Sequence, residues 1–226
     1  MRTQILLTFV TYFFCSCSSN HQKIPCQDLD LVINKTMQEN HLPGLAIAIV
    51  KDDSIIFAKG YGVRKLGESA TENISTPYYV KNEKVLPTEW EETGIYDPAD
   101  AIISNVMDLA NYIKLYLNNG IFENDTVINS ETLDQIQMPQ IITASWAKEY
   151  FNPEANFMTF GSGCAVSDYK GVKIIQMAGM ISGSTSLLTL VPSEKTGIAI
   201  QTNMAGALST FVPVNYKIID DLLSHP

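Results

Sequence analysis

Basic residues are scarce in this chain of 226 residues, in which 15 Lys and Arg stand against 24 Asp and Glu and give a formal net charge of −9. The basic residues are scattered, so the chain lacks the positive stripe of a nucleic-acid-binding protein, and we expect no nucleic-acid partner. The three His (His21, His41 and His225) suggest no Ser/His/Asp triad, and the spacing of the four Cys excludes a zinc cluster. We therefore expect no metal and no cofactor.

Long apolar runs are also missing. The segment from Ile5 to Phe14 is apolar over about ten residues, too short to span a bilayer but typical of a signal peptide, here residues 1–16. Cys17 follows a small residue at the end of this run, as in a bacterial lipobox, and is the predicted lipid attachment site, with residues 17–27 as a tether. We expect an exported protein of the bacterial cell envelope, held to the membrane by a lipid. Plain secretion, a periplasmic location and an uncleaved anchor are the alternatives.

The remaining chain has a hydrophobic share of 46%, which suits one globular domain with a core. Apolar spacing predicts helices over residues 28–40, after Ser104, after Ser130, and over residues 207–224. From Met158 the pattern turns to strands. GSGCAVSDY, which places Cys164 in a predicted strand, leads through a turn to the successive strand segments VKIIQMAG, STSLLTLVP and GIAIQTN. Residues 76–90 indicate an irregular, partly extended surface stretch. This order predicts an α+β fold.

Residues Leu42 to Lys65, LPGLAIAIVKDDSIIFAKGYGVRK, indicate two short strands around a polar turn. This hairpin resembles the opening of the serine β-lactamase and penicillin-binding-protein-like family, close to its class C and esterase branch. PADAIISNVMDLANYIKLYLNNG and YKGVKIIQMAG…GSTSLLTLVPSEKTGIAIQTN resemble later parts of that family in order and spacing. The resemblance implies a β-lactamase/transpeptidase-like domain, in which a five-stranded antiparallel sheet carries the N- and C-terminal helices on one face.

The resemblance is interrupted at residues 69–76, which we call the junction. In the family a long helical region follows the hairpin and carries a Ser-x-x-Lys nucleophile motif and a Tyr-x-Asn motif. Here the chain passes through GESATENIST directly into a segment that resembles a much later part of the family. The missing region would cover the second face of the sheet, so residues 28–226 are expected to form one truncated domain with an uncovered sheet face.

A serine nucleophile needs a nearby base to accept its proton. Ser-x-x-Lys strings occur at residues 145–148 and 167–170, which is close to what chance gives, and the second spans a strand end and a turn. The first precedes a Tyr-x-Asn string at residues 150–152, although the family separates these two motifs widely. Ser145 and Lys148 therefore stay candidates only for a hydrolase whose site has been rewired.

The third family motif, Lys-Thr-Gly or His-x-Gly on a strand, aligns with Met177, Ala178 and Gly179. Gly179 is retained, but a methionine cannot donate a charged hydrogen bond or relay a proton. The resemblance makes the backbone N–H of Met180 the vestigial oxyanion donor. The literal Lys-Thr-Gly string at residues 195–197 follows Pro-Ser-Glu, and we interpret it as a turn.

Three functions follow. The first is a degenerate or internally truncated relative of the family that is inactive as written. The substrates of the family are β-lactams, D-alanyl peptides and small esters. The second is a non-catalytic envelope lipoprotein that binds a protein partner, or a second copy, through the uncovered sheet face. The third is a hydrolase that uses Ser145 and Lys148.

Overall fold

The computed structural model describes residues 28–67, 74–90, 94, 102–143, 147–148 and 151–223. Several sequence predictions lie outside these residues: the signal peptide, Cys17 and its tether, Ser145, Tyr150 and residues 69–73 of the junction. None of the described helices is long and apolar enough to cross a bilayer.

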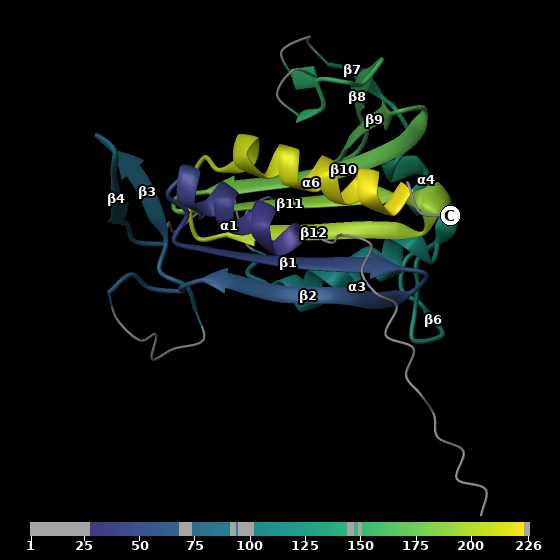
Figure 1. Cartoon of the computed structure of the whole chain (residues 1–226). Coiled ribbons are helices and arrows are strands. Elements are labelled where there is room, and N and C mark those ends of the chain that lie inside the picture. The colour runs from purple at the N-terminus through teal and green to yellow at the C-terminus, as the bar shows by residue number, and fades with distance from the viewer. Residues whose placement is uncertain are drawn as a thin grey trace, which may run out of the picture.

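The described residues form an eight-stranded antiparallel sheet with helices on both faces (Figure 1). Its strands lie in the order β2-β1-β12-β11-β10-β9-β8-β7. Their bounds, in that order, are Ser54–Gly62, Gly44–Lys51, Thr196–Thr202, Ser184–Val191, Val172–Ile181, Ala165–Tyr169, Met158–Phe160 and Ile141–Ile142.

The sheet is therefore larger than the five strands expected from the sequence. The hairpin β1–β2 and the strands β10, β11 and β12 are present as predicted. Strands β9, β8 and β7 extend the sheet beyond β10, and the last two contain only three and two residues. Strand β9 lies within GSGCAVSDY, where a strand was predicted. Strands β7 and β8 are too short to show an alternating apolar pattern, so the sequence did not reveal them.

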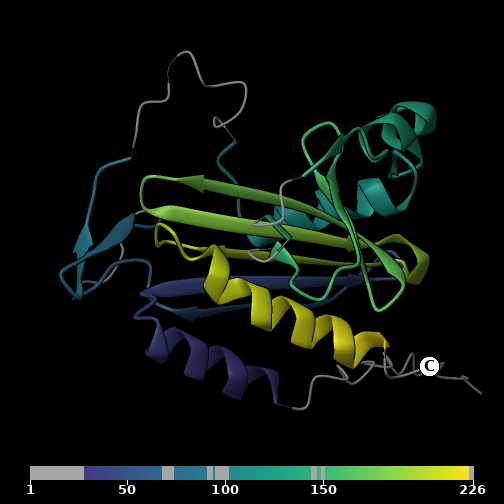
Figure 2. The ribbon, with the colours of Figure 1, turned by 90° about the horizontal axis from the view of Figure 1, so that it is seen from above.

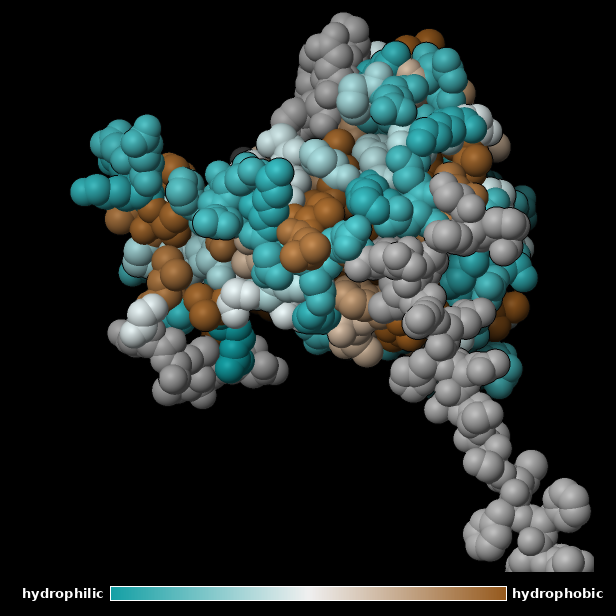
Figure 3. Space-filling view, in the orientation of Figure 1, coloured by the Kyte–Doolittle hydropathy of each residue, from teal (hydrophilic) through white to brown (hydrophobic). Residues whose placement is uncertain are grey.

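Helices α1 (Leu29–Glu39) and α6 (Leu208–Leu223) pack together on one face, which we call the α6 face (Figure 2). Ile33 of α1 and Phe211 of α6 are fully buried against Ile47 of β1 and Ile198 of β12. This arrangement of the two terminal helices is the one predicted. Seen from this side, the surface is largely hydrophilic (Figure 3). Hydrophobic patches lie near the hairpin of β3 (Tyr78–Lys81) and β4 (Lys84–Pro87), where Val80 is 50% exposed.

Helices α3 (Val106–Leu117) and α4 (Ser130–Ile136) lie on the opposite face, which we call the α3 face (Figure 2). Ala110 and Ile113 of α3 are fully buried with Ala48 of β1 and Ala199 of β12. The expectation of an uncovered sheet face is therefore wrong for this half of the sheet. The helix was predicted from its apolar spacing, but its place on the sheet depends on packing that sequence spacing does not specify.

Both of these helices begin one residue away from the predicted cap. The side chain of Asn105, not Ser104, accepts hydrogen bonds from the N–H groups of Met107 and Asp108. Asn129, not Ser130, accepts one from Glu131. Asn and Ser are both favoured at this position, so adjacent candidates cannot be separated from sequence alone.

Residues expected to be irregular form a small hairpin, β3 (Tyr78–Lys81) with β4 (Lys84–Pro87). Tyr78 is only 2% exposed, so part of this stretch belongs to the core and not to the surface. A second small hairpin, β5 (Ile121–Phe122) with β6 (Asp125–Thr126), follows α3. A 3-10 turn, η2 (Pro192–Glu194), joins β11 to β12.

Candidate functional site

The candidate site is the end of β10 from Met177 to Met180, beside the turn into β11. The Met177 side chain is half-buried and packs on the α3 face against the cluster that contains Cys164, Val166 and Leu188. Leu188 lies directly opposite Met177 in the β10–β11 register. Met177, which the sequence resemblance aligns with the family's Lys or His, therefore packs against the core, and its only polar atom is a thioether sulfur.

The outer edge of β10 is open at this end. β9 pairs with β10 only from Val172 to Gln176, so no described strand lies beside Met180 on that side. Ile181 and Ser184 flank the two-residue turn and form the last pair of the ladder. Because opposite residues alternate between bonded and non-bonded pairs, we infer that the N–H of Met180 points away from β11, toward the open edge.

Two polar side chains that sequence reasoning missed lie on the inner side of β10, in line with Gly179 across β11 and β12. Ser186 is opposite Gly179 on β11, and its hydroxyl donates a long hydrogen bond of 3.5 Å to the Gly179 carbonyl. Gln201 is opposite Ser186 on β12, and its amide donates to the Ser104 carbonyl just before α3. The polar positions share the α3 face with Leu188 and Ala199, so period-two alternation in the two strands carried the signal.

Lys148 lies on the other side of the sheet. Its segment forms a short helical turn, in which the Asn152 N–H donates to the Lys148 carbonyl at 2.8 Å. Ala147 packs against Ala165 of β9. Ala165 points to the face opposite to that of its neighbour Val166, which belongs to the α3-face core. The Lys148 segment therefore packs on the α6 face, whereas Met177 faces α3.

The literal Lys-Thr-Gly string is a turn and a strand start, as interpreted from the sequence. Lys195 ends η2 with a left-handed backbone (φ 45°), and Thr196 begins β12. Strand β11 separates it from the edge of β10. Gly197 is needed for packing: a Cβ there would lie 2.2 Å from Cγ2 of Ile113 in α3.

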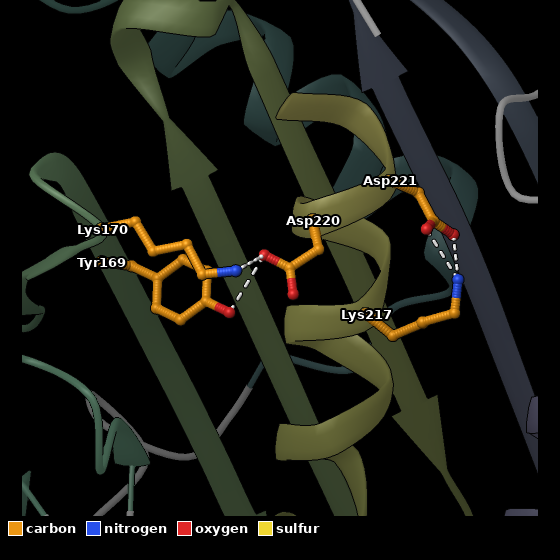
Figure 4. A network of polar contacts seen from close by, with 5 residues as sticks. All are labelled: Tyr169, Lys170, Lys217, Asp220 and Asp221. Carbon is orange, nitrogen blue, oxygen red and sulfur yellow. Dashed lines mark hydrogen bonds and ion pairs between the residues drawn. The ribbon is translucent and has the colours of Figure 1, made fainter. Parts of the chain in front are cut away.

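The second Ser-x-x-Lys string ties secondary-structure elements together. Ser167 is buried and accepts a hydrogen bond from Asn152. The hydroxyl of Tyr169 and the ammonium of Lys170 both donate to Asp220 of α6 (Figure 4). The hydrogen bond to Asp220 raises the pKa of Lys170 above its ordinary value, so this lysine stays protonated and is unsuited to act as a base.

Metal binding and thiol chemistry find little support near the candidate site. Among the described residues, no three His, Cys, Asp or Glu side chains gather as metal ligands would. Cys164 is buried on the α3 face, and burial raises the pKa of its thiol. The described edge of β10 thus offers backbone hydrogen-bonding groups, a serine hydroxyl and apolar surface.

Comparison of sequences gives distant relatives. No family model matches the chain. "Protein flp" of Staphylococcus aureus strain MW2 is 25% identical over 139 residues, which is 59% of this chain and 26% of that protein. The same protein of strain N315 is 23% identical over 134 residues. The match thus spans about a quarter of the length of these relatives.

Comparison of structures is more informative. A class C β-lactamase from Rhodobacter sphaeroides superposes with a TM-score of 0.66 at 10% identity, covering 86% of this chain and 99% of that one. The octameric penicillin-binding protein homologue from Pyrococcus abyssi gives a TM-score of 0.64 at 13% identity, covering 84% and 76%. The chain therefore has the serine β-lactamase and penicillin-binding-protein-like fold, as the sequence resemblance implied. At these identities the likeness concerns the fold alone.

Proposed function

We propose that the chain is an exported envelope protein, attached to lipid at Cys17, that keeps the β-lactamase-like fold without its acylation chemistry. The observation that carries the proposal is the packing of Met177, the residue that the sequence resemblance aligns with the family's Lys or His. Its side chain packs into the α3-face core, where a thioether can neither carry a proton nor attract an anion.

The reasoning concerns proton transfer. Attack of a serine on a carbonyl needs a base to accept the hydroxyl proton, and the oxyanion donor alone does not replace that base. The Lys148 segment lies on the α6 face, away from the face on which Met177 lies. In the second Ser-x-x-Lys string, Ser167 accepts a hydrogen bond from Asn152, and Lys170 donates one to Asp220. These placements favour inactivity over a rewired hydrolase built on Ser145 and Lys148.

Covalent labelling tests this proposal. Purified protein is incubated with fluorescent penicillin and, separately, with a fluorophosphonate probe, and the labelled fraction is measured by intact-mass spectrometry. We expect no adduct with either probe. A stoichiometric adduct would refute inactivity, and its loss in Ser145→Ala but not in Ser167→Ala would support the rewired hydrolase.

The second candidate function is non-covalent binding at the open edge of β10. It is favoured by the inferred direction of the Met180 N–H and by the neighbouring Ser186 hydroxyl. Such an edge suits an extended peptide, which adds to a sheet through main-chain hydrogen bonds. The family's D-alanyl peptides are the first ligands to try, and a protein partner or a second copy of the chain would use the same edge.

A proline substitution separates this binding from general surface effects. Met180→Pro removes the N–H, and proline is tolerated on a strand edge that faces solvent. Met180→Ala is the matched control, because it shortens the same exposed side chain and keeps the N–H. Calorimetric titration with a D-alanyl peptide should detect binding to the parent and to Met180→Ala, but not to Met180→Pro. Equal binding by all three proteins would exclude this edge.

The lipid anchor is tested independently. Labelling with palmitate in a bacterial host should mark the parent chain and fail with Cys17→Ser. Cys15→Ser, two residues earlier, is the control that should retain the label. Retained label in Cys17→Ser would show that this cysteine is not the attachment site.

A further inference from the structure

Strand β2 forms one edge of the eight-stranded sheet, and no described strand pairs with its outer side (Figure 1). It has nine residues, whereas β7 at the opposite edge has only two. Natural sheets protect their edges with short strands, bulges, proline or lysine. β2 has no proline, and the register shift in its pairing with β1 lies near its start, so residues 57–62 pair regularly. The outer side of these residues is therefore open to another strand.

Lys59 is the only charged residue of β2, and it does not cover the edge. Its ammonium group donates a hydrogen bond of 2.7 Å to Asp30 of α1, so the side chain lies over the α6 face. Tyr61 donates to the same carboxylate at 2.6 Å. The neighbours of Lys59 are Ala58 and Gly60, which are exposed and too small to shield the main chain.

The pairing of β2 with β1 determines which main-chain groups face outward. The N–H of Val63 donates to the carbonyl of Pro43 at 2.8 Å, so the main chain of Val63 faces β1. Main-chain groups in an antiparallel strand alternate in direction from one residue to the next. The N–H and C=O groups of Ala58, Gly60 and Gly62 therefore point away from β1, where a further strand can bond to them.

The two ends of β2 carry charges of opposite sign. Asp52 and Asp53 form the turn before the strand, and Arg64 and Lys65 follow it. Asp52 and Arg64 are both exposed. In an antiparallel pair, the beginning of one strand lies beside the end of the other. A second β2 in this orientation would bring the acidic turn of each copy to the basic end of the other.

We propose that two copies of the chain associate through β2, with Ala58 on the two-fold axis. Ala58 is the middle residue of the strand, so this register overlaps the two strands over their full length. It places Asp52 opposite Arg64 of the second copy and Lys59 opposite Phe57, so no like charges oppose each other within the strand. Such an isologous contact joins the two sheets into one and closes the edge at β2.

Disulfide cross-linking tests this register in the full chain. In a hydrogen-bonded antiparallel pair, opposite Cα atoms are about 5.5 Å apart, which a disulfide can bridge. Ala58→Cys should therefore give a cross-linked dimer on mild oxidation, measured by non-reducing gel electrophoresis against the parent chain. Gly60→Cys is the matched control, because it is exposed on the same strand but its two copies would lie about 14 Å apart.

A proline substitution tests the main-chain hydrogen bonds. Sedimentation velocity of the full chain in mild detergent should show a dimer whose share rises with protein concentration. Ala58→Pro removes an outward N–H, which a strand edge tolerates, and should abolish this dimer. Ala58→Ser keeps the N–H and should retain the dimer. Urea unfolding checks that both variants are folded.

Charge reversal tests the ends of the strand. Asp52→Arg would place like charges opposite each other at both ends of the paired strands. It should raise the Kd of the dimer about fivefold or more, because two exposed ion pairs turn from attraction to repulsion. Arg64→Asp should have the same effect. Combining the two substitutions should restore the Kd of the parent, which a merely structural role of either residue would not predict.

Several results would overturn the proposal. These are a monomer at every concentration, equal cross-linking of Ala58→Cys and Gly60→Cys, equal dimerisation of Ala58→Pro and Ala58→Ser, and a double charge reversal that fails to restore the Kd. None of these measurements uses a ligand or an acylation probe, and none involves the edge of β10. A failure here is therefore distinct from a failure of the proposed function.

Discussion

Gly197 offers a direct test of how α3 covers the sheet. A Cβ at this position would lie 2.2 Å from Cγ2 and 3.4 Å from Cβ of Ile113, which is fully buried. Isoleucine is branched at Cβ and confined to few rotamers in a helix, so it cannot move aside without shifting α3. Gly197→Ala should therefore lower the free energy of unfolding by about 3 kcal/mol, the upper end for overpacked cores.

The substitution of Ile113 also destabilises the protein, but it does so by removing side-chain volume at the same contact. Ile113→Ala leaves a cavity over β12 and should cost about 3 kcal/mol, within the range for large-to-small core changes. In the double variant the new methyl group of residue 197 occupies space that Ile113 has vacated. The double variant should then be about 2 kcal/mol more stable than the sum of the single changes predicts, a coupling expected only of residues in contact.

Urea unfolding followed by fluorescence or circular dichroism measures all four proteins. Gly60→Ala is the control, because Gly60 lies on β2 without a positive φ and nothing stands within 4 Å of its added Cβ. That change should be neutral or stabilising by about 0.5–1 kcal/mol. Additivity of Gly197→Ala and Ile113→Ala within about 0.5 kcal/mol would show that α3 does not pack on β12 as described.

Three further predictions concern buried polar groups. Burial raises the pKa of the Cys164 thiol, so it should resist a thiol reagent at pH 8 in the native protein and react fully in urea; rapid native labelling would place it at the surface. Burial opposes ionisation of Asp168, but hydrogen bonds from the side chain and N–H of Asn156 and the N–H of Phe157 outweigh it and hold the pKa below its ordinary value of 3.8. The ionised Asp168 therefore contributes to stability above about pH 4, and this contribution is lost as the pH falls through the lower pKa of the folded protein. Measured by urea unfolding, Asp168→Asn should cost about 1.5–3 kcal/mol at pH 7 and less at pH 3. Neither amide atom of Asn215 has a partner among the described residues although the side chain is fully buried, so Asn215→Leu should raise the midpoint of thermal unfolding, with a gain of about 1–2 kcal/mol; a lower midpoint would mean that the amide is satisfied.

The site was only partly accessible from sequence. Alignment placed Met177 at the family's Lys or His position, and the structure adds that this side chain belongs to the α3-face core. Ser186 and Gln201 were missed, because neither matches a family motif and their strands contain other polar residues, such as Thr189 and Thr202, from which no local pattern separates them. Their nearness to Gly179 follows from register across three strands, which no local pattern specifies.

The sequence by itself determined the elements whose apolar periodicity is long and unbroken. These elements are helices α1, α3 and α6, the β1–β2 hairpin and strands β10 to β12. Each either repeats an apolar period over eight or more residues or is bounded by clear turns. Local sterics and burial therefore suffice to specify them. Tertiary structure alone decided which face α3 covers, because Ile113 fits only where β12 carries a glycine and β1 an alanine. It also decided the short strands β7 and β8 and the hydrogen bond from Thr76 to Arg64 that joins the flanks of the junction, since these depend on pairings between separate segments that have no local signature.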